Sequence, residues 1–90
     1  IIPKEIGNLT NLEHLNLHGN KITTCNFVEN FLNLKELDIS NNQIKKIPLE
    51  IGNLINLEDL CLYNNKITIL PLEIGTLTNL KDICIDNTYE

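Results

Sequence analysis

The feature that most constrains this chain of 90 residues is an internal repeat with a period of 22 or 23 residues. Within each unit, apolar residues stand at the first, fourth and sixth positions, and an Asn stands at the ninth position of the first three units. A unit this short cannot bury its own apolar edge, so consecutive units must stack on one another. The sequence therefore predicts a row of stacked coils, with aligned units that begin at Leu12, Leu34, Leu57 and Leu80.

Each unit joins a strand signal to a turn signal. Alternating apolar residues over about five positions predict a short strand, and strands stacked in register form a parallel sheet with neighbours about 4.8 Å apart. Pro48 and Pro71, each followed two residues later by Glu, can begin a short helical turn on the way to the next strand. The return at residues 23–30 lacks this Pro and is one residue shorter, so we expect it to bulge or tighten.

This pattern resembles the leucine-rich repeat family over essentially the whole chain. The return phrase I-P-x-E-I-G-N-L is most similar to that of the intracellular Ras-binding-type subclass, whose repeats have about 22 to 24 residues. The phrase occurs, with small changes, at residues 2–9, 47–54 and 70–77. Plant receptor repeats share the phrase I-G-N-L-T-N-L found at residues 6–12, but they usually carry a Gly where this chain has Lys45 and Lys46. They are therefore the second choice of subclass.

The resemblance implies an α/β solenoid of about four coils, with a short parallel sheet on its concave face and loops or short helical returns on its convex face. The chain is then a single leucine-rich-repeat domain, and we expect it to be a fragment of a longer array. Its units are a partial repeat at 1–11, repeats at 12–33, 34–56 and 57–79, and a partial repeat at 80–90, where Thr88 replaces the Asn.

The Asn column has a chemical reason in such a fold. A tight turn out of each strand leaves buried backbone groups unpaired, and each such group costs about 1 to 3 kcal/mol. An Asn amide both donates and accepts hydrogen bonds, so it can pair these groups between neighbouring coils. We interpret Asn20, Asn42 and Asn65 as this structural ladder rather than as catalytic residues.

Alternate residues of a strand share a face, so the residues between the Leu and Ile columns are expected to line the concave surface and contact a partner. Five of these twelve residues are carboxylates and none is Lys or Arg, whereas Lys21, Lys45, Lys46 and Lys66 fall in the loops that leave the strands. This segregation of charge favours a basic partner, and a purely solvated surface is the alternative. The candidate partner-binding residues are His14, Glu36, Asp59 and Asp82 in the first column, Asn16, Asp38, Cys61 and Cys84 in the second, and His18, Ser40, Tyr63 and Asp86 in the third.

The three cysteines form no recognisable metal or disulfide motif. Cys61 and Cys84 fall in one column on neighbouring strands, where a disulfide would be strained because the two Cβ atoms point the same way. Tetrahedral zinc needs more donors than this pair supplies. We expect both thiols to be exposed spectators, with a regulatory thiol pair or a metal site as the alternatives, and we expect Cys25 to be a small core residue.

The sequence predicts a non-catalytic protein–protein interaction module that binds a partner protein through its acidic concave strands. It predicts no catalytic residue, cofactor or metal, because no Ser, His and acid arrangement, phosphate-binding Gly loop or recessed carboxylate pair is present. The resemblance to the Ras-binding-type subclass implies a signalling protein, such as a small GTPase, as the partner. The alternative is a structural or self-assembly segment of a longer solenoid, which forms homo-oligomers through exposed terminal coils.

Composition limits the other partners and the location. The formal net charge is -5 and all seven basic residues are Lys, so nucleic acid is not expected as a partner. No apolar run approaches the roughly 20 residues needed to cross a bilayer, so no membrane contact is expected. An odd number of cysteines favours a reducing, cytoplasmic location. The single sequon, Asn8-Leu9-Thr10, makes the extracellular part of a receptor-like protein the alternative.

Overall fold

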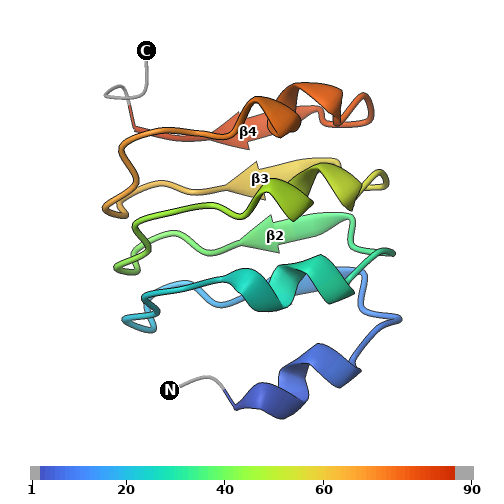
Figure 1. The fold of residues 1–90 in the computed structure, drawn as a ribbon, viewed down its shortest axis with the longest axis horizontal. Helices are drawn as coiled ribbons and strands as arrows, with labels where there is room; N and C mark the ends of the chain where they lie inside the picture. Colours follow the sequence, from blue (N-terminus) through green and yellow to red (C-terminus); the bar gives the residue numbers. More distant parts are fainter. Residues whose placement is uncertain (1–2, 87–90) are drawn as a thin grey trace.

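In the computed structural model, which describes residues 3–86, each repeat folds into a coil with one short strand and one 3₁₀ helical turn (Figure 1). Thr88, which stands in the fourth Asn place, lies outside the described residues. The elements are η1 (Lys4–Asn8), β1 (His14–Asn16), η2 (Asn26–Asn30), β2 (Glu36–Asp38), η3 (Leu49–Asn53), β3 (Asp59–Cys61), η4 (Leu72–Thr76) and β4 (Asp82–Cys84).

The strands form one parallel sheet in the order β1-β2-β3-β4, and the register follows the repeat, with Leu37 of β2 directly opposite Leu60 of β3. Each strand has three residues, fewer than the five or so expected. The chain turns away soon after each of the first three strands, because Gly19, Asn41 and Asn64 have φ angles of 75°, 56° and 59°. A left-handed residue cannot continue an extended strand, so the paired segments stay short.

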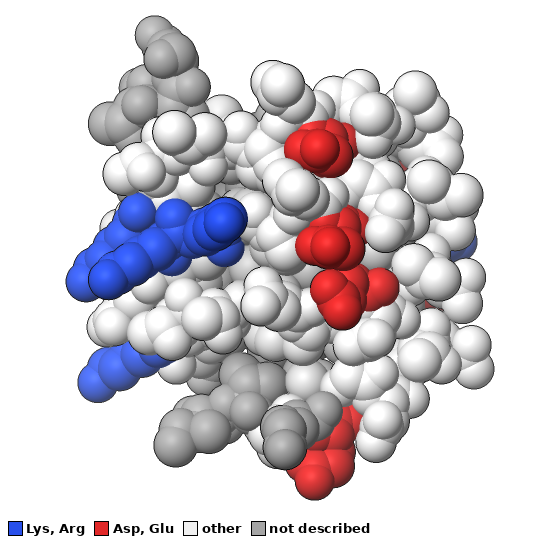
Figure 2. Space-filling view, in the orientation of Figure 1, with Lys and Arg blue, Asp and Glu red and all other residues white. Residues whose placement is uncertain are grey.

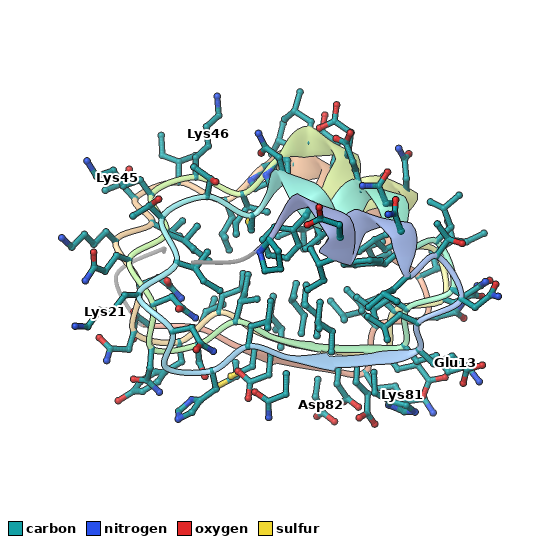
Figure 3. All side chains as sticks on the ribbon, turned by 90° about the horizontal axis from the view of Figure 1, so that it is seen from below. Glu13, Lys21, Lys45, Lys46, Lys81 and Asp82 are labelled. Atoms are coloured by element: carbon teal, nitrogen blue, oxygen red, sulfur yellow. The ribbon has the colours of Figure 1, made fainter. Side chains whose placement is uncertain are left out.

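A largely aliphatic core, which also contains Phe31 and Cys25, fills the space between the sheet and the 3₁₀ turns (Figure 3). Leu37 and Leu60, on the two central strands, are fully buried, as the period of two predicts. Leu15, on the first strand, is only half-buried, and Ile83, on the last, is exposed. Each central coil is therefore covered by a neighbour on both sides, and this burial of apolar surface is the main source of stability.

The return that lacks Pro keeps the same 3₁₀ turn as the other returns. Nine residues, 17–25, separate β1 from η2, whereas ten residues, 39–48 and 62–71, separate the next two strands from their turns. The backbone at Cys25 compensates for the missing residue. Its φ of −132° and ψ of 31° differ from the extended values of −67° and 149° at Pro48. The return tightens at its entry and does not bulge.

None of the helical turns in residues 3–86 has the length and apolar character that spanning a membrane requires.

Candidate functional site

The exposed side of the sheet, which we call the strand face, carries a hollow of about 650 Å³. Its polar lining comes from the first two predicted columns, and the strand residues between them, Leu15, Leu37, Leu60 and Ile83, complete the lining. The structure thus brings together eight of the twelve candidate partner-binding residues, which are His14, Asn16, Glu36, Asp38, Asp59, Cys61, Asp82 and Cys84. The third column lies outside the hollow.

The first column places carboxylates beside one another across three strands, because Glu36, Asp59 and Asp82 are register partners. The pKa of Asp59 is raised by partial burial, by a hydrogen bond to Asp82 and by the negative charges of Asp82, Glu36 and Glu58. At the end of the column, His14 Nδ1 lies 2.9 Å from Glu36 Oε1. Asp59 and Asp82 have no Lys or His partner among the described residues, so the column is suited to a positively charged ligand group.

The second column brings the thiols of Cys61 and Cys84 together on β3 and β4. Both cysteines are free, Cys61 is half-buried and Cys84 is exposed. A hydrogen bond to Cys61, burial, and the negative charges of Cys61, Asp38 and Asp86 raise the pKa of Cys84. Cys25 is a core residue, as predicted, and burial raises its pKa to about 12.

The third column corrects one prediction, because Ser40 is only 4% exposed and cannot contact a partner. Its backbone N–H and its hydroxyl both donate to Asp38 Oδ1, at 2.9 and 2.5 Å, and the ring of His18 lies over it with Nδ1 3.1 Å from Oγ. Side chains from its own coil and from the preceding coil thus cover Ser40. Tyr63, by contrast, is 49% exposed, and Asp86 accepts the Asn64 backbone N–H at 3.1 Å.

The amide of Asn42 links two coils and is only 8% exposed. Its Oδ1 accepts the backbone N–H groups of Asn20 and Ile22, each at 2.9 Å. Its Nδ2 lies within hydrogen-bonding distance of three backbone carbonyls, those of Leu17, Ile39 and Ser40.

The other two members of the Asn column make fewer bonds. Asn65 accepts the Ile44 N–H at 3.0 Å and donates to Ile39 and Leu62. Within residues 3–86 the Asn20 side chain donates only to Leu17 and His18 of its own coil, so the predicted bridge between coils is not made by this side chain.

A second row of polar side chains, next to the Asn column but exposed, was not predicted from the sequence. Asn64 Nδ2 donates to Asn41 Oδ1 at 2.6 Å, and Asn41 Nδ2 lies 3.1 Å from His18 Nδ1. The signal for this row was the doubled Asn at 41–42 and 64–65. The first Asn of each pair takes the left-handed conformation that Asn tolerates better than most residues.

Negative charge is not confined to the strand face, which corrects the expected segregation of charge. Acidic side chains also form a column over the 3₁₀ turns (Figure 2), where Glu5, Glu29, Glu50 and Glu73 each lie in the first turn. Positive charge gathers along one edge, with Lys21, Lys45 and Lys46 pointing outward there (Figure 3). At the opposite edge Lys81 lies 3.6 Å from Glu58, in an exposed ion pair.

No three His, Cys, Asp or Glu side chains are grouped closely enough within residues 3–86 to hold a metal ion.

Comparisons with known proteins agree with the repeat and with the fold. A family model described as "Leucine Rich repeats (2 copies)" matches residues 10–51 and again residues 32–71. A solved leucine-rich repeat protein of Leptospira interrogans superimposes with a TM-score of 0.90 and 44% identity over 97% of this chain. No curated protein matches at a significant level.

Two internalins of Listeria monocytogenes also share the fold. Internalin F gives a TM-score of 0.69 with 25% identity over 97% of the chain, and internalin C2 gives 0.69 with 24% identity over 93%. The chain spans 22% of the Leptospira protein and 34% and 48% of the two internalins.

Proposed function

The chain belongs to the leucine-rich repeat family, whose members generally bind other proteins, and we propose that its strand face binds a basic segment of a partner protein. The observation that carries this proposal is the in-register column Glu36, Asp59 and Asp82, in which partial burial, a hydrogen bond to Asp82 and then the repulsion of neighbouring negative charges raise the pKa of Asp59. A Lys or Arg side chain placed on this column relieves that repulsion, and the gain is absent for a neutral or acidic ligand.

The spacing of the column suggests the form of the ligand. Two strand spacings separate Glu36 from Asp82, which is about 10 Å. In a polyproline II segment, which has three residues per turn and rises about 3.1 Å per residue, residues three apart point the same way and are separated by about 9 Å. A polyproline II segment that crosses the strands with basic residues at positions i and i+3 therefore matches the two ends of the column. Tyr63, exposed beside the hollow, offers an aromatic surface for the adjoining part of the segment.

The test compares two double variants with the same change in net charge. Asp59→Asn with Asp82→Asn removes two charges from the strand face, and Glu50→Gln with Glu73→Gln removes two from the 3₁₀ turns. The Kd of a labelled peptide with Lys at i and i+3 is measured by fluorescence anisotropy at about 0.15 M salt, where charges more than about 8 Å apart are largely screened.

The strand-face variant should weaken peptide binding about tenfold or more, a loss of about 1.4 kcal/mol in binding free energy. The control variant should stay within about twofold of the unmodified chain. Equal losses in the two variants would show that only net charge attracts the peptide, and the proposed binding face would then be wrong.

The partner class and the location rest on the sequence alone. We keep a small GTPase or another signalling protein as the candidate partner, on the resemblance to the Ras-binding-type subclass, and the cytoplasm as the proposed location. Pull-down with a panel of signalling proteins, using the strand-face variant as the negative control, tests the partner.

A second candidate function is self-association through the last coil. Leu72 is 92% exposed there, and Ile69 and Ile83 are exposed as well. Covering these side chains would gain roughly 1.5 kcal/mol or more each. Sedimentation over a range of concentrations should then show association that Ile83→Lys abolishes. A chain that stays monomeric, with a working strand face, would leave the interaction module as the sole function.

A further inference from the structure

We propose that Cys61 and Cys84 form a two-coordinate thiolate site for a soft monovalent cation, with Cu(I) as the ion to be tested. The two residues are direct register partners on β3 and β4, both are free, and both line the hollow on the strand face. This site is independent of the proposed binding of a basic segment, because it uses the second column and a different chemistry.

The geometry of neighbouring parallel strands suits an ion between the thiols better than a bond between them. Register partners lie one strand spacing apart, about 4.8 Å, and their Cβ atoms project in the same direction. Two metal–sulfur bonds as long as a zinc–thiolate bond, about 2.3 Å, placed on opposite sides of one ion, separate the sulfurs by about 4.6 Å. A disulfide needs Cβ atoms about 3.8 Å apart, so it would require the two strands or side chains to converge.

The surroundings exclude an ion that needs more ligands. The next residue in the column is Asp38, but its Oδ1 already accepts the backbone N–H and the hydroxyl of Ser40. No group of three potential ligands occurs among residues 3–86. Zinc takes four ligands in structural sites and so does not fit, whereas thiolates select Cu(I), which accepts two sulfur ligands in a linear arrangement.

Charge and proton balance are consistent with a cation at this position. Binding of Cu⁺ breaks the two S–H bonds and forms two Cu–S bonds, and two protons pass to the solvent without any electron transfer. Asp38 and Asp86 add negative charge near the pair, which raises the local concentration of cations.

The test titrates the fully reduced 90-residue chain with Cu(I) under anaerobic conditions, in competition with a coloured Cu(I) chelator. The unmodified chain is compared with Cys61→Ser, with Cys84→Ser and with Cys25→Ala as the matched control, since Cys25 lies in the core. Circular dichroism of each variant confirms that it is folded, and X-ray absorption of the loaded chain counts the sulfur ligands.

We expect one Cu(I) per chain, bound by two sulfurs, in a particle that sediments as a monomer. Each surface substitution should weaken the apparent affinity by at least about 100-fold, and the control should change it by less than about threefold. Cu(I) affinity retained by either serine variant would overturn the proposal, as would a copper ion that bridges two chains and makes the loaded protein dimeric.

Discussion

Replacement of Asn42 by Leu should lower the free energy of unfolding by about 2 to 4 kcal/mol, and the structure identifies which groups cause the loss. The three carbonyls beside Asn42 Nδ2 each keep a second donor. Leu17 still accepts Asn20 Nδ2, Ile39 still accepts Asn65 Nδ2, and Ser40 still accepts the Gly19 N–H. The carbonyls therefore contribute little to the expected loss.

The two N–H groups that donate to Asn42 Oδ1 are in a different position. The N–H groups of Asn20 and Ile22 have no other acceptor among the described residues. A buried N–H without a partner costs about 1 to 3 kcal/mol. Ile22 is buried, so its N–H would be left without any partner, whereas Asn20 is exposed and its N–H can form a hydrogen bond with water. The expected loss of about 2 to 4 kcal/mol is therefore smaller than the full cost of two buried N–H groups without partners.

The assay is urea unfolding followed by circular dichroism, with Asn20→Leu as the matched control. Asn20 accepts no backbone N–H through its side chain within the described residues, so its substitution orphans no donor and should cost less than about 1 kcal/mol. Equal losses for the two variants, or a loss below about 1 kcal/mol at Asn42, would refute the reasoning that orphaned N–H groups dominate.

Three further predictions concern the core, the thiols and the acidic column. Leu60→Ala should cost about 2 to 5 kcal/mol in the same urea assay, because the side chain is fully buried between two coils. Cys84 is exposed and should react with a thiol reagent in the native protein, at a rate lowered by its raised pKa, whereas Cys25, which is 1% exposed and has a pKa of about 12, should react only after unfolding. The raised pKa of Asp59 means that the folded state holds its proton more tightly, so stability is lost as pH rises through that pKa. Asp82→Asn should therefore stabilise the chain at about pH 7, and the gain should vanish below the ordinary Asp pKa of about 3.9, as thermal melts across this range would show.

Much of the fold follows from the repeat because every unit buries the same apolar columns against its neighbours. The spacing of the Leu and Ile columns was sufficient to predict that Leu37 and Leu60 are buried and that the strands are parallel and in register. The same spacing assigned Cys61 and Cys84 to one column on neighbouring strands. The subclass within the family could not be decided in this way, because it depends on a few exposed return residues that carry little packing energy.

The sequence by itself determined on which face of the strand each side chain lies, because side chains alternate between the two faces with a period of two and this alternation needs no tertiary contact. Only the tertiary structure decided which of those residues remain accessible. The Ser40 side chain lies on the same face as Tyr63, but Asp38 from its own coil and His18, 22 residues earlier, cover the Ser40 hydroxyl. Cover of this kind depends on side-chain rotamers and on hydrogen bonds across the coil interface, and neither is encoded in the period of the repeat.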